Sequence, residues 1–432
     1  MVQYGGTSAF LGVTGLVCLA AFLAIFPGLV GMIIKRKMEH SSAWGMVIWI
    51  PALWIAKDLV IEKIFSGFPW CLIGYSQYKN IYFTQVAEIG GIHLVSFLVI
   101  AVNVLLYEFL KTKNKKILIA LLGVCLIIYG SGYWLLQKQG RLSAAVPWHR
   151  AGIVQPNSNH DQLFNFANTQ KILDKLFNDS LTLKKQGAEL VVWPEFTVPI
   201  YPLQTLFYKE QFTAFSGRFV PILAGFTDFR NADNVFNSAM LFNGERIEKY
   251  DKFHLTPFGE YVLFRRWLFF VKKITDQIGD FTFGKTLHNL EFAGHQLATP
   301  ICYEVIYPEL TRELVVQGAD VIVTISNDSW FGRSSAPYQH LAMAVFRSIE
   351  NRRFLLRSTS NGISALVDPA GRIIYQSPLH KADSFLASFQ YLQHKTIFTR
   401  CGYLFPYFCF FLILADRIWA LLRKLKKQFH QP

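Results

Sequence analysis

The stretch that decides the fold is AELVVWPE at residues 188–195, a short apolar run that ends in a carboxylate. An uninterrupted apolar run of this length is typical of a strand buried on both faces. The same design recurs in LATPICYE at residues 297–304, where the run ends at Cys302. Ligands bind at the carboxyl ends of strands in α/β sheets, so both stretches indicate a site at a sheet edge.

Around these two stretches, from about residue 148 to 395, short apolar runs alternate with helix-like stretches. RAGIVQPN and PILAGFTDF read as strands, and NSAMLFNGERIEKY reads as a hairpin that turns at Asn243-Gly244. Helical spacing runs from Gln162 to Gln186 and from Pro337 to Asn351, a strand follows Gly318, and a second hairpin turns at 368–371. Strands alternating with helices predict α/β layers and exclude a β-sandwich.

The composition of the whole chain indicates a membrane protein with a large water-exposed part. Hydrophobic residues make up 52% of the chain, charged residues only 17%, and phenylalanine alone contributes 39 residues. These values exclude a disordered or fibrous protein. The net charge of +14 favours anionic lipid over nucleic acid as a partner in so apolar a chain. The six cysteines are too few for a disulfide scaffold.

Five stretches are apolar and long enough to cross the roughly 30 Å hydrocarbon core of a bilayer. They cover residues 8–34, 42–61, 89–107, 117–136 and 401–422. A signal peptide is the alternative for the first stretch, but the stretch has neither a basic leader nor a clear small-residue cleavage site. We therefore expect membrane helices over residues 1–140, a soluble domain over 148–395, one C-terminal helix, and a basic tail over 423–432.

Basic clusters predict the orientation of these helices. Lysine and arginine gather at residues 35–37, 111–116 and 423–427, whereas the loop GFPWCLIGYSQYKN at 67–80 holds only Lys79. The positive-inside rule places each of these clusters in the cytoplasm. The domain over 148–395 then lies on the outer side of the cytoplasmic membrane.

Three side chains of complementary chemistry follow predicted strands: Glu195, Lys252 and Cys302. A carboxylate can take the proton of a thiol. An ammonium group can lower the thiol pKa and stabilise the oxyanion of a tetrahedral intermediate. Spacing alone also allows a structural glutamate, a surface lysine and a buried cysteine, and composition by itself favours that plainer interpretation.

Four local motifs favour the catalytic interpretation of these three residues over the structural one. WPE at 193–195, KYDKFHLTPFGEYV at 249–262, ICYE at 301–304 and NDSWFG at 327–332 together resemble the carbon-nitrogen hydrolase (nitrilase) superfamily. With GFPWCLIGYSQ at 67–77 and the flanking apolar stretches, the chain resembles the apolipoprotein N-acyltransferase family specifically. The resemblance implies a nitrilase-like αββα sandwich inserted between membrane helices, four before it and one after.

The resemblance also implies roles for individual residues. It makes Glu195 the general base, Cys302 the nucleophile and Lys252 the third member of a Glu-Lys-Cys triad. Glu260 would hold Lys252 charged and oriented, with an ordinary surface glutamate as the alternative. Tyr303 and Glu304 match the family's neighbours of the nucleophile and would shape the site. Trp330 matches an aromatic loop residue that would contact acyl chains or gate entry, with interfacial anchoring as the alternative.

The family activity implied is transfer of a fatty acyl chain from a membrane phospholipid, through a cysteine thioester, to the N-terminal α-amine of an apolipoprotein's S-diacylglyceryl-cysteine. The implied location is the bacterial cytoplasmic membrane, and we expect a monomer. The runner-up is a membrane-tethered amidase or nitrilase acting on a small amide. A non-catalytic envelope or transport protein would not explain three reactive groups at strand ends. No CxxC, HExxH or Rossmann glycine pattern is present, so we expect no metal, cofactor or nucleic acid.

Two departures from the family pattern stand out. The sequence begins near where a third family helix would lie, which suggests a short form lacking the first two. QPNSNHDQLF at 155–164 replaces a more usual basic-aromatic segment. A Cys-His pair through His254 is a further alternative, but the family uses glutamate as the base, so we expect His254 to form structural hydrogen bonds.

Overall fold

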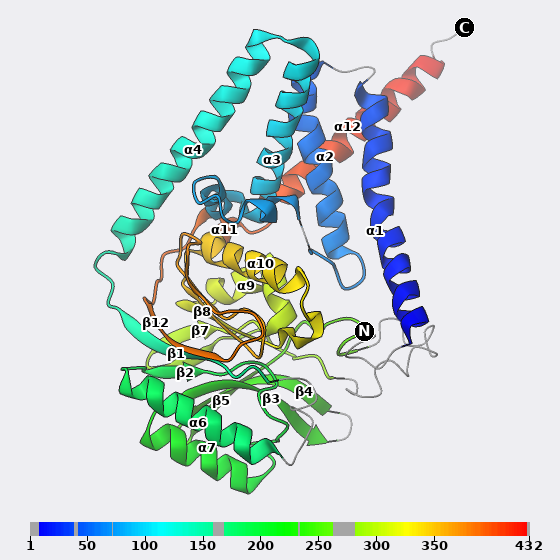
Figure 1. Cartoon of the computed structure of the whole chain (residues 1–432). Helices are drawn as coiled ribbons and strands as arrows, with labels where there is room; N and C mark the ends of the chain where they lie inside the picture. Colours follow the sequence, from blue (N-terminus) through cyan, green and yellow to red (C-terminus); the bar gives the residue numbers. More distant parts are fainter. Residues whose placement is uncertain are drawn as a thin grey trace.

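The computed structural model describes residues 8–38, 42–70, 72–158, 168–231, 234–261 and 281–429. Long helices form one end of the molecule and an α/β sandwich forms the other (Figure 1). The apolar stretches at both ends of the chain come together in the helical end, since α12 crosses the N-terminal helices.

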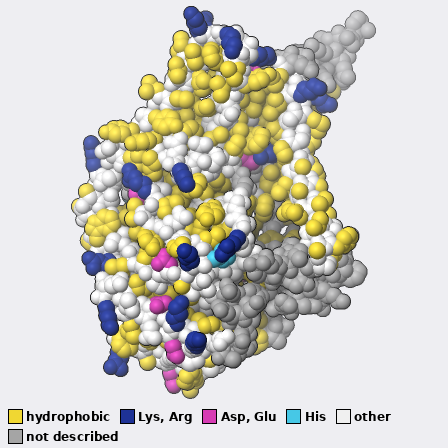
Figure 2. All heavy atoms as spheres, in the orientation of Figure 1, with side chains coloured by type: hydrophobic (Ala, Val, Ile, Leu, Met, Phe, Trp, Pro, Cys, Tyr) yellow, Lys and Arg dark blue, Asp and Glu magenta, His cyan; other side chains and the backbone are white. Residues whose placement is uncertain are grey.

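Five helices in the described part of the chain are long and apolar enough to cross a membrane. They are α1 (Ala9–Met38), α2 (Ala43–Lys63), α3 (Ala87–Thr112), α4 (Lys115–Ser143) and α12 (Leu404–Phe429). Figure 2 shows hydrophobic atoms over much of this end. The exposed basic residues of the α3–α4 turn lie at its far tip: Lys111, Lys113, Lys115 and Lys116. A surface that is apolar in the middle and basic at the tip suits a bilayer and its headgroups.

Two six-stranded mixed sheets form the sandwich in the described residues. The first has the order β12-β1-β2-β3-β4-β5 and the second has the order β11-β10-β9-β8-β7-β6. The strands of the first sheet are β1 (His149–Gln155), β2 (Leu190–Val192), β3 (Ile222–Asn231), β4 (Asn234–Asn243), β5 (Arg246–Asp251) and β12 (Asp383–Phe389). Those of the second are β6 (Leu290–Phe292), β7 (His295–Ala298), β8 (Val321–Ser326), β9 (Leu355–Thr359), β10 (Ala365–Val367) and β11 (Ile373–Gln376).

The parallel strands lie at the centre of each sheet, where β1, β2 and β3 run together, as do β7, β8 and β9. The hairpin that turns at Asn243-Gly244 is β4–β5, and the one at 368–371 is β10–β11. The sequence pattern did not reveal β12, which pairs antiparallel with β1 and closes that edge.

Helices cover the outer faces of both sheets (Figure 1). α6 (Thr169–Lys185) and α7 (Leu206–Arg218) lie against the first sheet, and α9 (Pro308–Val316) and α10 (Ala336–Asn351) lie against the second. Of the helix predicted from residue 162, residues 162–167 lie outside the described part. The layers are therefore αββα, and a dry apolar core between the sheets holds them together.

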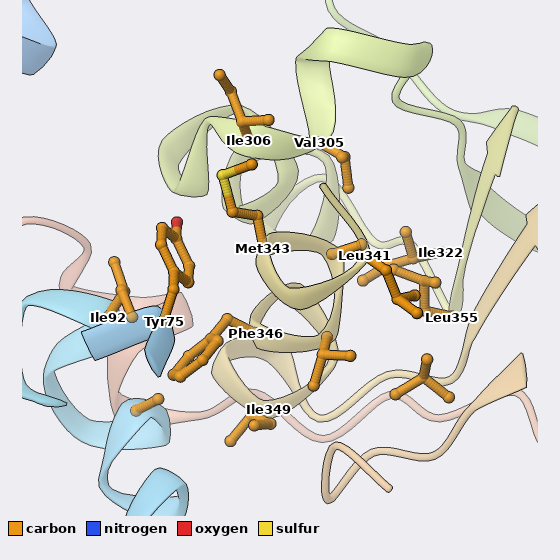
Figure 3. Packing of buried hydrophobic residues seen from close by; sticks show 14 of the residues in the cluster. Tyr75, Ile92, Val305, Ile306, Ile322, Leu341, Met343, Phe346, Ile349 and Leu355 are labelled. Atoms are coloured by element: carbon orange, nitrogen blue, oxygen red, sulfur yellow. The ribbon is translucent and has the colours of Figure 1, made fainter. Parts of the chain in front are cut away.

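The sandwich and the membrane helices share one continuous apolar core. Tyr75 and Ile92 from the helical end face Met343 and Phe346 of α10 (Figure 3). The ring centroids of Tyr75 and Phe346 are 5.2 Å apart. Because buried apolar side chains from both parts pack together here, packing fixes the position of the sandwich relative to the apolar helices.

A buried ion pair crosses the same interface. The Nε of Arg352, at the end of α10, lies 2.5 Å from Oε2 of Glu88 on α3, and both side chains are almost fully buried. A buried guanidinium needs such a partner, because an unpaired charge in this environment is costly. The pair therefore ties the sandwich to the helices at a defined point.

Candidate active site

Glu195, Lys252 and Cys302 line one pocket of about 380 Å³. Glu195 follows β2, Lys252 follows β5, and Cys302 begins the short 3-10 helix η5 (Cys302–Ile306) after β7. Two of these strands belong to the first sheet and the third belongs to the second. The face-to-face packing of the two sheets brings together three residues that are far apart in the sequence.

Lys252 lies between two carboxylates. Its Nζ is 3.1 Å from Oε1 of Glu195 and 3.0 Å from Oε1 of Glu260, and only 2% of the lysine is exposed. Burial acts to lower the pKa of Lys252, but the negative charges of Glu195 and Glu260 outweigh it and raise the pKa above its usual value. Lys252 is therefore a fixed cation in the pocket.

Asn237 on β4 holds the same two carboxylates from the other side. Its Nδ2 donates to Oε1 of Glu195 and to Oε1 of Glu260, at 2.7 Å in both cases. Backbone amides occupy the second oxygen of each carboxylate: the Asn327 N–H donates to Glu195 and the Thr256 N–H donates to Glu260, each at 2.8 Å. Both acids are thus fixed in orientation before any ligand binds.

The backbone of Cys302 is held in the left-handed region, with φ of 52°. A non-glycine residue with this conformation costs on the order of 1–3 kcal/mol and persists only where its surroundings impose it. Burial raises the pKa of the Cys302 thiol and Glu195 raises it further, while Lys252 acts to lower it. The resting thiol is therefore protonated, and it needs a base in order to act as a nucleophile.

Glu304 lies two residues after Cys302 and is fully buried. Its Oε1 accepts from the Tyr250 hydroxyl at 2.9 Å and from the backbone N–H groups of Phe253 and His254 at 2.7 and 2.9 Å. Its Oε2 accepts from the Ile301 N–H at 2.7 Å. Burial raises the pKa of Glu304 to about 7, although these donors act to lower it. One carboxylate thus connects the segment after Lys252 to the residue before Cys302.

His254 does not take the position of a catalytic base in this arrangement. Its ring packs on Tyr307, with centroids 4.0 Å apart. Burial, reinforced by the charge of Lys252, lowers the pKa of His254 to about 4. The imidazole is therefore neutral at pH 7. Among the described residues, no group of three or more His, Cys, Asp or Glu side chains is arranged to hold a metal ion.

Comparison with known proteins identifies the family. The family model for carbon-nitrogen hydrolase matches residues 150–390, and that for the apolipoprotein N-acyltransferase N-terminal domain matches residues 1–105. The apolipoprotein N-acyltransferase of Geobacter metallireducens is 30% identical over 100% of this chain and 84% of its own length. The chain belongs to the apolipoprotein N-acyltransferase family.

A second member of this family, from Pseudomonas aeruginosa strain PAO1, is 33% identical over 87% of this chain and 74% of its own length. Among solved structures, an amidase from Nesterenkonia sp. is similar to 58% of this chain and 95% of its own, with 18% identity and a TM-score of 0.45.

Aromatic residues make up much of the pocket wall of this N-acyltransferase family member. Phe68 and Trp70 come from the loop that follows α2, and Trp70 stacks on Tyr303 with ring centroids 6.4 Å apart. Trp330 lies on the 3-10 helix η6 (Asp328–Phe331) and lines the same pocket. The membrane-associated end of the protein therefore supplies part of the pocket, and the wall suits an apolar ligand.

Several site residues were not singled out from the sequence. Phe68, Trp70 and Asn327 lie inside motifs that marked the family, but no signal gave their individual roles. The sequence pattern places Asn237 in a hairpin strand, and the only signal of a further role is its polar side chain beside the apolar residues of that strand. His340, which also lines the pocket, sits within a predicted helix and carried no signal of its own.

Proposed function

We propose that this protein transfers a fatty acyl chain from a membrane phospholipid to the N-terminal α-amine of an apolipoprotein's S-diacylglyceryl-cysteine. The observation that carries the proposal is the aromatic pocket in which a thiol, a carboxylate and a fixed ammonium group meet, with part of its wall supplied by a loop between membrane helices. A soluble hydrolase acting on a small amide has no need of such a wall.

In the first step, the sulfur of Cys302 attacks the carbonyl carbon of a phospholipid acyl ester. Glu195 takes the thiol proton. Within the described part of the chain its Oε2 accepts one hydrogen bond, from the Asn327 N–H, which leaves a lone pair for that proton. Two of the three Nζ protons of Lys252 go to Glu195 and Glu260, which leaves the third for the oxyanion. When the carbon–oxygen ester bond breaks, Glu195 returns its proton to the departing lysophospholipid, and an acyl thioester remains on Cys302.

In the second step, the free α-amine of the lipoprotein attacks the thioester carbonyl. Glu195 now accepts a proton from the amine and passes it to the Cys302 sulfur as the carbon–sulfur bond breaks. An amide forms and the thioester breaks, so the enzyme returns to its starting state. Two substrates that use one site in turn predict ping-pong kinetics.

The membrane location follows from the same chemistry. Both substrates are anchored in lipid, so the pocket must open at the level of the bilayer surface. Five membrane-spanning helices in the bacterial cytoplasmic membrane, with the sandwich on the outer side, meet this requirement. The basic α3–α4 turn lies at the end of the molecule away from the sandwich, which suits a cytoplasmic position for that turn.

Intact-mass analysis of protein purified from membranes tests the proposal. We expect a mass increase of one long acyl chain on Cys302 that hydroxylamine removes, and no such adduct in Cys302→Ala. Addition of a diacylated lipopeptide should discharge the adduct and yield an N-acylated product. Absence of the adduct together with hydrolysis of small amides would instead identify a membrane-tethered amidase.

A further inference from the structure

A buried polar cluster lies directly behind the nucleophile. It consists of His340 on α10, Asp328 on η6 and Arg357 on β9, each at most 1% exposed. His340 Nε2 lies 3.2 Å from the backbone carbonyl oxygen of Cys302. Arg357 Nη2 lies 2.9 Å from Oδ2 of Asp328 and 3.0 Å from Nδ1 of His340.

The contact with Cys302 shows that Nε2 of His340 carries a proton. A carbonyl oxygen only accepts, so Nε2 must donate to Cys302. Nδ1 lies near both an acceptor and a donor, since it is 3.1 Å from Oδ1 of Asp328 and 3.0 Å from Nη2 of Arg357. Burial and the positive charge of Arg357 lower the pKa of His340, and together they outweigh the neighbouring carboxylate of Asp328, which acts to raise it. Asp328 and Arg357 therefore hold the ring so that its Nε2–H points at the nucleophile's own carbonyl group.

The same cluster also reaches the acid of the triad. Asp328 is held by Arg357 and by the Ser326 hydroxyl, which donates to it at 2.7 Å. Asp328 directly follows Asn327, whose backbone N–H donates to Oε2 of Glu195 at 2.8 Å. Fixing Asp328 thus fixes the amide that orients Glu195, while His340 fixes the carbonyl of Cys302.

We propose that His340, held by Asp328 and Arg357, is a positioning residue that keeps the Cys302 thiol and the Glu195 carboxylate in reactive alignment. The proposal deepens the acyl-transfer function proposed above and rests on it for the identity of the substrate. The alignment is needed because the left-handed backbone of Cys302 is maintained by its surroundings. Without the His340 hydrogen bond, the backbone is free to relax and turn the thiol away from Glu195.

The test measures the rate at which Cys302 reacts with iodoacetamide in the full-length protein in lipid nanodiscs, followed by peptide mass mapping. The formation of the acyl thioester from phospholipid is measured on the same samples. His340→Leu should lower both rates by about tenfold, since a buried carbonyl loses its donor. His340→Gln, whose amide nitrogen can still donate at that distance, should recover most of the loss.

Two further variants separate positioning from general stability. Gly362→Ala places a methyl group against Oδ2 of Asp328, closer than van der Waals contact allows, and so must displace that carboxylate. It should slow alkylation although every residue of the cluster is still present, so it serves also if His340→Leu does not fold. His93→Leu removes another fully buried imidazole, one paired with Glu62 on α2. It should lower the melting temperature and leave the alkylation rate of Cys302 unchanged.

The outcomes distinguish this proposal from the proposed function. Wild-type protein that is alkylated at Cys302 but never acylated would remove the acyl-transfer function, while the alkylation rates would still decide the positioning role. Equal alkylation rates in folded wild type and His340→Leu would overturn that role. So would a loss of rate in His93→Leu as large as that in His340→Leu.

Discussion

Replacing Glu304 with glutamine exchanges one acceptor oxygen of a buried carboxylate for an NH₂ group. With the amide oxygen in the Oε1 position, the bonds from Tyr250, Phe253 and His254 survive without their charge. The NH₂ group then faces the Ile301 N–H, so two donors oppose each other where a 2.7 Å hydrogen bond existed.

The cost is set by the orphaned Ile301 amide. A buried donor left without a partner costs about 1–3 kcal/mol, which is similar to the roughly 1–3 kcal/mol needed to hold a non-glycine residue in a strained conformation. Cys302 directly follows Ile301, so its left-handed conformation is no longer secured. Taking about 2 kcal/mol as the loss, we expect thioester formation to slow about thirtyfold.

Single-turnover formation of the Cys302 acyl thioester, followed by intact mass, measures this effect. Tyr250→Phe is the matched control, because it removes one of the four donors to the same carboxylate and leaves the Ile301 bond in place. We expect only a small decrease in rate for the control. Equal rates in Glu304→Gln and wild type, or equal losses in Glu304→Gln and Tyr250→Phe, would refute the reasoning.

Three further predictions follow from the same geometry. Glu195→Gln keeps the side-chain shape but cannot accept the thiol proton, so the rate of Cys302 acylation should fall by at least about 10²-fold. The rate should partly recover at alkaline pH, as the pH approaches the raised pKa of the thiol. A rate that does not change with pH would contradict this prediction. The pKa of His254 is lowered from 6.5 to about 4, so wild-type stability should fall as pH drops through this range; thermal melts of His254→Asn should show a weaker dependence. Arg352→Met leaves the buried carboxylate of Glu88 with Lys138, whose Nζ lies 3.5 Å away, and should destabilise the fold by about 1–3 kcal/mol. Glu88→Met in the same chain should restore part of the melting temperature; a double variant no more stable than the single one would count against it.

The sequence predicted the layers of the fold because strand and helix periodicities are local properties. Glu195 and Cys302 were recognisable for the same reason, since each ends an apolar run. The role of Asn237 was not recognisable, because it depends on how β4 lies in the folded sheet. Only that arrangement places the Asn237 amide between Glu195 and Glu260. The role of His340 could not be predicted from the sequence for a similar reason. Its contact with the nucleophile arises from how α10 lies on the second sheet, and helical spacing alone gives no information on that distance.

The apolar contact between α10 and the N-terminal helices has a consequence for any attempt to isolate the sandwich. A fragment spanning residues 148–395 would leave Met343 and Phe346 uncovered, would lose the aromatic side of its pocket contributed by Trp70, and would retain Arg352 without its counter-charge. Such a fragment should aggregate in water and show no acyl-transfer activity, even though Glu195, Lys252 and Cys302 are all present. We therefore expect the proposed catalysis to require the N-terminal helices together with the sandwich.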